Sequence, residues 1–506
     1  MQSIPLVVRA IDYLARTAIV DERGSLTYRD LLDQSARAAG TMLAGTDDLR
    51  EARVAFLMRP SASYVLTQWA VWRAGGIAVP LGVQHPEPEL THVIDDSGAS
   101  IVVADEEFEP LVRPIAERRG LRFLRTVQLT GVDPCALPAV VATRRAMLLY
   151  TSGTTGRPKG AVLTHLNIAA QITSLVEAWG WCADDHILEV LPLHHVHGIV
   201  NVLGCALWSG AVCEIASKFD VEQVWQRIVD ADGLTLFMAV PTIYTRLIKV
   251  WQAAPDQRKA QMSAGCAALR LMVSGSAALP VPTLESWRRI SGQTLLERYG
   301  MTEIGMALSN PLIGERRPGC VGEPLPGVMV RLVDESGDAV HDGVPGSIEV
   351  KGDGVFLEYW NRPDATAGAF TGDDWFKTGD VAVCEGGVFR ILGRRSVDII
   401  KTGGYKVSAL EIEDALCHHD AIDQVAVVGV DDDEWGQRVV AAVVLVEGSR
   451  LRPDQVRQWC KKHLAVYKVP SRVKFVESLP RSAMGKVTKV QVVKLFDREG
   501  DRPDCS

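Results

Sequence analysis

Short apolar runs alternate with longer amphipathic stretches along the first half of the chain. The runs cover residues 54–58, 77–80 and 101–104. Each is short and rich in aliphatic side chains, which is typical of a strand inside a sheet. Between them, residues 62–74 favour a helix that two glycines close, and Leu90, Val93 and Ile94 mark one face of a second helix. This alternation predicts a parallel sheet covered by helices.

Two changes of pattern divide the rest of the chain. A second unit of the same kind spans about residues 170–300, and short strands with glycine and proline turns dominate from 322 to 390. We therefore expect an α/β fold class, with a large N-terminal domain of two α/β subdomains plus a β-rich subdomain, and a small α+β C-terminal domain. More than one domain is expected because 506 residues exceed what one hydrophobic core usually supports. The pattern becomes α+β after Arg394, so the predicted domains are residues 1–394 and 395–506.

Composition and charge exclude several classes of partner. A net charge of −8 argues against a nucleic-acid-binding surface. The longest apolar stretch, residues 198–212, is too short to span a bilayer, so we expect a core helix and strand and no membrane partner. The N-terminus predicts no cleavable leader. Ten cysteines without a C-x-x-C pair indicate reduced thiols and a cytoplasmic location.

A loop rich in glycine and hydroxyl groups follows an apolar run at residues 146–150. Its candidate ligand-binding residues are Thr151, Ser152, Gly153, Thr154, Thr155, Gly156 and Lys159. The glycines let backbone amides approach an anion, while the hydroxyls and Lys159 supply further donors. The loop therefore predicts a polyphosphate site at a strand end, with an ordinary turn as the alternative. It is not a Walker A loop, since Gly160 follows the lysine and Pro158 prevents a helix from starting.

Four further motifs follow in order. They are Tyr299-Gly300-Met301-Thr302-Glu303, Lys377-Thr378-Gly379-Asp380, Gly393-Arg394 with Lys401-Thr402-Gly403-Gly404-Tyr405-Lys406, and Pro480-Arg481-Ser482-Ala483-Met484-Gly485-Lys486. Together with the loop, this series resembles the acyl-adenylate-forming enzymes, the superfamily of acyl-CoA synthetases, luciferases and adenylation domains. The resemblance covers nearly the whole chain. Within the superfamily the chain is most similar to the malonyl-CoA synthetases, through residues 193–198, 240–246, 297–307 and 396–413.

The resemblance implies ATP, Mg²⁺ and coenzyme A, and a reaction in two steps. A carboxylate acylates poorly, so it is first joined to AMP with release of pyrophosphate, and cations must screen the charge around the α-phosphate. By resemblance, Thr302 contacts that phosphate, Glu303 binds the metal and Lys486 acts in adenylation. The other nucleotide-binding residues so implied are Ser276, Arg298, Tyr299 and Gly300, with Asp380 and Arg394 at the ribose.

The second step transfers the acyl group to the thiol of coenzyme A. In the resembled family the small C-terminal domain is mobile. It rotates, withdraws the lysine and presents Gly403 and Gly404 as the wall of a pantetheine tunnel, where glycines let a ligand pass close to the backbone. The family's pivot is often a lone Asp or Lys, whereas this chain has Arg395-Ser396-Val397-Asp398, so the pivot residue stays open.

Two arginines are candidates for binding the acyl substrate. Arg298 directly precedes Tyr299, and Arg246 follows an apolar strand end. A buried cation without a partner is costly, so two arginines at an acyl pocket favour an anion. A distal carboxylate fits the planar guanidinium.

A purely structural role is the alternative for both arginines. For Arg298 this would be an ion pair with Glu297 or Glu303. His197, together with His195, is a candidate at the same pocket, and a hydrogen-bonded core histidine is the alternative.

We therefore predict an ATP-dependent acid–thiol ligase that joins malonate or methylmalonate to coenzyme A, with AMP and pyrophosphate as products. A medium-chain fatty-acyl- or aryl-CoA synthetase is the nearest alternative, followed by an adenylation enzyme that loads a carrier protein. A non-catalytic nucleotide-binding module is disfavoured because Lys159, Glu303, Asp380 and Lys486 are all present. The choice between the two dicarboxylates, the oligomeric state and the pathway that uses the product stay open.

Overall fold

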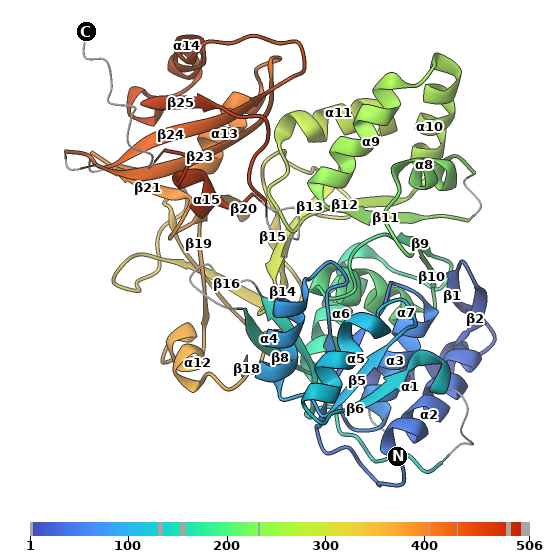
Figure 1. Cartoon of the computed structure of the whole chain (residues 1–506). Helices are drawn as coiled ribbons and strands as arrows, with labels where there is room; N and C mark the ends of the chain where they lie inside the picture. Colours follow the sequence, from blue (N-terminus) through green and yellow to red (C-terminus); the bar gives the residue numbers. More distant parts are fainter. Residues whose placement is uncertain are drawn as a thin grey trace.

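The computed structural model describes residues 4–129, 135–151, 158–230, 233–403, 405–432, 434–481 and 487–496. Within these ranges the strands form four sheets, of which two are large, one is small and antiparallel, and one lies in the C-terminal part of the chain (Figure 1). Two α/β subdomains, a β-rich subdomain and a smaller α+β domain are therefore present, which confirms the predicted fold class.

The first α/β subdomain contains a seven-stranded sheet of order β18-β8-β7-β4-β3-β5-β6. Its strands are β3 (Arg53–Leu57), β4 (Ile77–Pro80), β5 (Ile101–Ala104), β6 (Arg122–Arg125), β7 (Arg145–Thr151), β8 (Lys159–Thr164) and β18 (Glu358–Tyr359). The intervening helices are α3 (Ala62–Arg73), α4 (Glu87–Ser97) and α5 (Glu109–Arg118). β3 to β7 pair in parallel, whereas β8 and β18 run antiparallel to their neighbours. The strands and helices predicted for this unit are confirmed.

Alternation along β3 shows how this sheet separates two hydrophobic cores. Val54 and Phe56 face a large core that also receives α3 and the second α/β subdomain. Ala55 and Leu57 face the opposite side, where α4 and α5 pack. Because both faces are covered, the strand is apolar at nearly every position, as the sequence shows.

The second α/β subdomain contains a nine-stranded sheet of order β15-β14-β13-β12-β11-β9-β10-β1-β2. Its strands are β1 (Thr17–Asp21), β2 (Gly24–Thr27), β9 (His186–Glu189), β10 (Val212–Ile215), β11 (Leu236–Ala239), β12 (Leu271–Ser274), β13 (Leu296–Met301), β14 (Gly305–Ser309) and β15 (Glu323–Pro324). Its helices include α2 (Tyr28–Leu43), α6 (His165–Trp179), α8 (Val221–Asp230), α9 (Pro241–Ala253), α10 (Asp256–Ala268) and α11 (Val281–Ser291). The sequence placed this unit at residues 170–300, but β1 also joins it, in parallel with β10.

The apolar stretch at residues 198–212 lies in the core of this subdomain. It forms η3, a π-helix (His197–Gly204), then α7 (Cys205–Ser209) and the first residue of β10. Its side chains are nearly all buried, which confirms the predicted core helix and strand. None of the described helices combines the length and apolar character that crossing a membrane requires.

The β-rich subdomain is a four-stranded antiparallel sheet of order β16-β17-β19-β20. Its strands are β16 (Val328–Val333), β17 (Gly346–Gly352), β19 (Phe376–Glu385) and β20 (Val388–Arg394), with α12 (Pro363–Ala369) between the second and third. Before α12 the chain leaves this sheet to add β18 to the edge of the first sheet. The β-rich subdomain is therefore tied to the sheet that carries the glycine-rich loop.

The C-terminal domain is a sheet with helices on both faces. Its strands are β21 (Ile399–Thr402), β22 (Tyr405–Ser408), β23 (Ile422–Asp432), β24 (Gly436–Leu445) and β25 (Arg472–Phe475), and its helices are α13 (Ala409–Cys417), α14 (Pro453–His463) and α15 (Lys489–Val493). Val427 and Ala441 face one core, with α13 and α14. Val428 and Ala442 face the other, with α15.

The junction between the β-rich sheet and the C-terminal sheet is short. β20 ends at Arg394 and β21 begins at Ile399. Between them, the Asp398 amide donates to the Arg394 carbonyl at 2.8 Å, and the Asp398 carboxylate pairs with Lys489 Nζ of α15 at 2.6 Å. Lys489 also pairs with Glu413 of α13 at 2.8 Å. The division at residues 394 and 395 and the identity of the pivot stay predictions.

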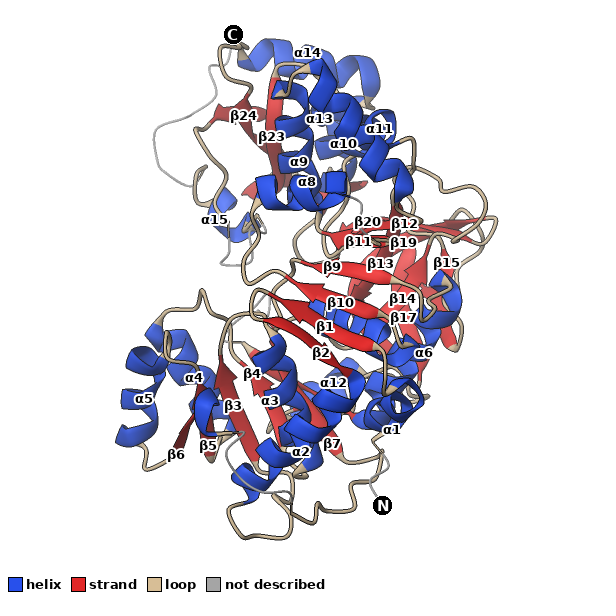
Figure 2. Cartoon of the chain, turned by 90° about the vertical axis from the view of Figure 1, so that its right-hand side faces the viewer, coloured by secondary structure: helices blue, strands red, loops and turns tan. Residues whose placement is uncertain are grey.

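Among the described residues, two polar contacts join the C-terminal domain to helices of the second α/β subdomain. Figures 1 and 2 show α13 next to α11, with α9 nearby. Oδ1 of Asp414, on α13, accepts from the Val281 amide at the start of α11 at 3.4 Å. Lys249 of α9 pairs with Asp423 of β23 at 3.0 Å.

Candidate active site

The hairpin β19–β20 and the strand β13 bring three predicted site residues into contact. Tyr299 donates its hydroxyl to Oδ2 of Asp380 at 2.5 Å, and Arg394 Nε lies 3.2 Å from Oδ1 of the same carboxylate. Asp380 and Arg394 are directly opposite in the hairpin register, which explains their spacing in the sequence. Both oxygens of Asp380 are thus held in fixed positions.

The Asp380 carboxylate is deeply buried, with 5% of its surface exposed. Burial raises its pKa, and the neighbouring Arg394 guanidinium and the Tyr299 hydroxyl oppose that rise. Each oxygen of an ionised carboxylate can accept more than one hydrogen bond. Asp380 can therefore accept from two further hydroxyls, as a ribose would offer.

Glu303 lies in the turn that follows β13, next to the half-buried Thr302. Its Oε1 accepts from the Tyr359 hydroxyl at 2.9 Å, and burial raises its pKa. No lysine or arginine of the described residues forms an ion pair with it. A buried, ionisable oxygen ligand of this kind suits Mg²⁺, which keeps waters and substrate phosphates as its other ligands. The described residues contain no group of three or more metal-ligating side chains, so substrate and water would have to complete the coordination.

β7 and β8, on either side of the glycine-rich loop, pair as antiparallel strands, so the element after the loop is a strand and not a helix. Thr151 pairs with Lys159 across these two strands. Lys159 Nζ lies 5.3 Å from the centroid of the Tyr359 ring. The loop residues Ser152, Gly153, Thr154, Thr155 and Gly156 lie outside the described residues.

Tyr359 is a site residue that the sequence did not reveal. It connects Glu303 with Lys159, two residues of different motifs. The strand that contains it, β18, is only two residues long and offers no motif of its own. The pairing of β18 with β8 and the hydrogen bond from the Phe356 amide to the Glu303 carbonyl bring it here, and neither contact leaves a local signal.

Three further predicted residues form a chain of polar contacts at the carboxyl end of β12. Arg298 donates from Nη2 to Oγ of Ser276 at 3.3 Å, and that Oγ lies 3.1 Å from Nδ1 of His197. The guanidinium lies against the backbone of Gly275, where a Cβ would come within 2.5 Å of Arg298 Cζ. Ser276 has a φ of +68°, which is uncommon for a residue with a side chain and is typical of functional sites.

Arg298 is a buried cation, with 3% of its surface exposed. Burial lowers its pKa to about 9, so it stays protonated at neutral pH. Glu297, its neighbour on the strand, instead accepts from the Leu279 amide at 3.3 Å, and burial raises the Glu297 pKa to about 8. Glu303 is bonded to Tyr359. Across the described part of the chain no ion pair includes Arg298, so the structural alternative is absent.

Arg246 and His195 are placed differently from Arg298. Arg246 is exposed on α9, with its guanidinium 5.8 Å from the ring of Phe219. No hydrogen bond or ion pair among the described residues joins it to Arg298. The His195 ring lies 4.0 Å from that of His194, next to the π-helix that begins at His197.

In the C-terminal domain, Gly403 lies in the turn between β21 and β22. Its φ is +53°, and a Cβ there would come within 2.8 Å of the Trp435 ring. Its amide donates to the Trp435 carbonyl at 2.9 Å. Glycine is therefore required by the backbone and by the close approach of the indole. Gly404 and Lys486 lie outside the described residues.

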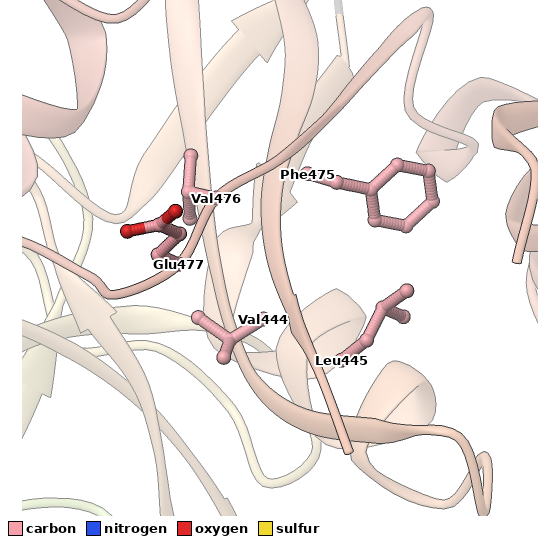
Figure 3. A pocket seen from close by; sticks show the side chains of 5 residues that line it. All are labelled: Val444, Leu445, Phe475, Val476 and Glu477. Atoms are coloured by element: carbon pink, nitrogen blue, oxygen red, sulfur yellow. The ribbon is translucent and has the colours of Figure 1, made fainter. Parts of the chain in front are cut away.

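Gly300 is also fixed by close packing, since a Cβ there would lie 2.1 Å from the Gly305 carbonyl oxygen. Two cavities among the described residues lie elsewhere. One, of about 320 Å³, is lined by side chains at the ends of β24 and β25, among them Phe475 and Leu445 (Figure 3). The other, also about 320 Å³, is lined by Arg395, Lys401 and neighbours at the domain junction. Neither contains a predicted substrate residue, so the polar contacts described above define the candidate site.

Comparisons with known proteins show which proteins this chain is similar to. Residues 8–360 match the family described as AMP-binding enzyme, and residues 411–486 match the AMP-binding enzyme C-terminal domain. The mitochondrial malonate–CoA ligase ACSF3 of Homo sapiens is 48% identical, over 98% of this chain and 92% of the human protein. The ATP-bound structure of MatB from Rhodopseudomonas palustris has a TM-score of 0.90 and 34% identity, and covers 98% of this chain and 99% of its own.

A malonyl-CoA ligase solved as a ternary product complex with methylmalonyl-CoA and AMP is also similar. It is 36% identical, covers 94% of this chain and 100% of its own, and has a TM-score of 0.70. The present structure therefore superposes more closely on the ATP-bound structure than on this product complex.

Proposed function

The chain belongs to the AMP-binding enzyme family, and from that premise we propose that it is an ATP-dependent, AMP-forming acid–thiol ligase that converts malonate to malonyl-CoA. In the first step a malonate oxygen attacks the α-phosphorus of ATP, and the bond to pyrophosphate breaks. In the second step the thiol sulfur of coenzyme A attacks the acyl carbon, and AMP leaves. The relatives named malonate–CoA ligase support this assignment.

The choice of malonate rests on one observation: Arg298 is buried, and no ion pair among the described residues neutralises its charge. A cation taken out of water is costly unless an anion meets it. Ser276 offers Arg298 a polar contact but no negative charge, and His197 contacts Ser276 in turn. We therefore propose that the carboxylate of malonate that does not react binds Arg298, while the other faces the nucleotide. A fatty-acyl or aryl substrate would leave this charge unneutralised.

The nucleotide is held by the β13 turn and the β19–β20 hairpin in this proposal. Asp380 accepts from the ribose hydroxyls, with Arg394 and Tyr299 fixing its orientation. Thr302 contacts the α-phosphate. Lys159 and the loop around it bind the β- and γ-phosphates through amides and charge.

We propose Glu303 as the magnesium ligand, because its carboxylate is buried beside the phosphate-binding residues and forms no ion pair with a described cation. Bound there, Mg²⁺ would screen the repulsion between the incoming carboxylate and the triphosphate. Tyr359 orients the Glu303 carboxylate through a hydrogen bond.

The C-terminal domain serves both steps in this proposal. Lys486 stabilises the charge that develops on the α-phosphate during adenylation. After rotation of the domain, Gly403 and Gly404 line the path of the pantetheine arm, where the absence of Cβ atoms leaves room. The arrangement described above then corresponds to the adenylation step, since it is nearer to the ATP-bound relative.

Two details remain proposals of the same kind. Methylmalonate shares both carboxylates of malonate and is the second candidate substrate. The nine described cysteines are all free thiols, which supports a reducing compartment, and we propose the cytoplasm.

A carboxylate panel tests the proposal directly. Pyrophosphate release would be measured with malonate, methylmalonate, succinate, butyrate, octanoate and benzoate, with and without coenzyme A, and the thioester identified by mass spectrometry. We expect the highest kcat/KM with malonate and formation of malonyl-CoA. A preference for butyrate or benzoate would refute the choice of malonate, and transfer to a holo carrier protein instead of coenzyme A would favour the carrier-loading alternative.

A further inference from the structure

We propose that Tyr359 is a positioning residue for adenylation, which uses its hydroxyl to orient the metal-binding carboxylate of Glu303 and its ring to hold the ammonium group of Lys159. This inference rests on the proposed function, because the roles of Glu303 and Lys159 come from it. Tyr359 lies outside both the motif that contains Glu303 and the loop that contains Lys159.

The hydroxyl contact fixes one side of the phosphate site. Tyr359 donates to Oε1 of Glu303 at 2.9 Å, which leaves the other carboxylate oxygen for a cation. A group that hydrogen-bonds a metal ligand fixes the orientation of that ligand. In other metal sites, removal of such a group commonly lowers metal affinity by about 10- to 100-fold.

The ring contact fixes the other side. Lys159 Nζ lies 5.3 Å from the ring centroid of Tyr359, within the range of cation–π attraction. Lys159 is half-buried, and no ion pair of the described residues includes it. The tyrosine ring is therefore the feature that aligns this cation, and phosphate can still approach the ammonium group because the ring does not neutralise it.

The backbone around Tyr359 makes this bridge rigid. Tyr359 pairs with Ala161 of β8, and the Trp360 amide donates to the Gly160 carbonyl at 2.8 Å, one residue after Lys159. The Phe356 amide donates to the Glu303 carbonyl at 2.7 Å. A short segment thus holds both functional residues by main chain as well as side chain.

Packing holds the ring in this position. The Phe356 ring contacts the Tyr359 ring edge-on at 4.7 Å, and Phe370 stacks on Phe356 at 5.8 Å without contacting Glu303 or Lys159. Tyr359→Phe removes the hydroxyl and keeps the packing. Tyr359→Leu removes both the hydroxyl and the ring. Phe370→Leu is the matched control, because it disturbs the same aromatic cluster and neither functional contact.

The test combines adenylation assays at varied MgCl₂ with calorimetric titration of ATP, with and without Mg²⁺. We expect Tyr359→Phe to raise the Mg²⁺ concentration for half-maximal adenylation about tenfold, and to leave ATP binding without Mg²⁺ as in the wild type. Tyr359→Leu should in addition weaken ATP binding without Mg²⁺. Thioester formation from supplied malonyl-adenylate should be unaffected in both variants, since it uses neither triphosphate nor metal.

The proposal is overturned if Tyr359→Phe shows the wild-type Mg²⁺ dependence, or if Phe370→Leu shifts that dependence equally. Should Tyr359→Leu fail to fold, Tyr359→Phe alone still decides. Glu303→Gln separates this failure from a failure of the proposed function. If the wild type depends on Mg²⁺ and Glu303→Gln does not respond to it while Tyr359→Phe behaves as the wild type, Glu303 retains its role and Tyr359 has none.

Discussion

The hydroxyl of Tyr299 donates a hydrogen bond of 2.5 Å to Oδ2 of Asp380, although the two residues belong to different subdomains. Tyr299 lies in β13 of the second α/β sheet, and Asp380 lies in β19 of the β-rich sheet. The contact aligns the strand that carries Thr302 and Glu303 with the hairpin that carries Arg394. It therefore sets the distance between the phosphate-binding and ribose-binding parts of the site.

Replacement of Asp380 should weaken ATP binding. In Asp380→Ala two hydrogen bonds to the ribose are lost, and hydrogen bonds to a charged group contribute about 1.5–3 kcal/mol each. We expect the KM for ATP to rise at least about tenfold, with a smaller change in the KM for malonate. Glu349→Gln is the control, because Glu349 is equally buried in the same subdomain and pairs with Arg331 away from the site. An unchanged KM for ATP in a folded Asp380→Ala enzyme would make Asp380 a turn residue.

Replacement of Arg298 should change which acid the enzyme accepts. Arg298→Met removes the buried charge and adds apolar surface, so kcat/KM for malonate should fall about 10²-fold, equivalent to a lost contact of about 3 kcal/mol. Butyrate should gain in relative kcat/KM. Arg298→Lys should rescue malonate only in part, because lysine keeps the charge without the planar fork.

The control for this prediction is Arg316→Met. Arg316 is half-buried and bonds the carbonyls of Pro311, Thr294 and Leu312, with no contact to the site. Arg316→Met should reduce the stability of the protein and leave the ratio of kcat/KM for malonate to kcat/KM for butyrate unchanged. Equal loss of both substrates in Arg298→Met would assign Arg298 to the fold or to the nucleotide instead.

Local pattern was enough to predict most of the fold. Strands such as β4 and β5 are continuous apolar runs because both faces of their sheet are covered, and that property is visible in a few adjacent residues. The pairing of Ile19 with Cys213 is different. It depends on packing between segments far apart in the sequence, so the entry of β1 into the second sheet had no local signal.

The same distinction applies to the site. The motifs around Tyr299, Asp380 and Arg394 were found because each is a short string, and the structure brings these three together. The motifs gave neither the contact between Ser276 and His197 nor the role of Tyr359, because each depends on side chains from different elements. Glu297 and Arg298 are adjacent in the sequence, which suggested an ion pair between them. Alternation along the strand instead places their side chains on opposite faces of the sheet.

The free energy of unfolding should decrease as the pH falls, because His165 is buried in its neutral form. This histidine is the first residue of α6, and burial lowers its pKa to about 3, from an ordinary value near 6.5. Between these values the unfolded chain binds a proton that the folded chain does not, so stability present above pH 6.5 is lost as the pH falls. The slope is about 1.4 kcal/mol per pH unit, or about 2 kcal/mol by pH 5.

Thermal unfolding of His165→Phe and the wild type between pH 7 and pH 5 measures this contribution. Phenylalanine can keep the edge-on contact with Trp72, whose ring lies 5.5 Å from that of His165. The variant should lose less stability than the wild type over this range. His463→Gln, at an exposed histidine of α14, should lose as much as the wild type. Parallel curves for wild type and His165→Phe would contradict the prediction.

Lys486→Ala should separate the two half-reactions. Loss of a charge that acts on the transition state should reduce adenylation about 10²-fold or more, while thioester formation from supplied malonyl-adenylate survives. Lys461→Ala, at an exposed lysine of α14, is the control and should affect neither step. A Lys486→Ala enzyme that loses both half-reactions equally would exclude the assigned role.

The ion pair between Lys249 and Asp423 should favour adenylation over thioester formation. It joins α9 to β23 at 3.0 Å in the arrangement that is nearer to the ATP-bound relative, and a rotation of the C-terminal domain would have to break it. Lys249 is 60% exposed, so the pair contributes at most about 1 kcal/mol, or about a fivefold change in population.

Lys249→Glu places two negative charges together and should slow adenylation by about two- to fivefold, with thioester formation unchanged or faster. The charge-swapped double variant Lys249→Asp with Asp423→Lys should restore the wild-type ratio of the two half-reaction rates. High salt should reduce all of these differences because exposed charges are screened.

Arg258→Glu is the matched control, since Arg258 pairs with Glu222 at 3.1 Å inside the second α/β subdomain and is also exposed. If Lys249→Glu slows both half-reactions equally, or if Arg258→Glu changes their ratio as much, the pair does not select between the two arrangements.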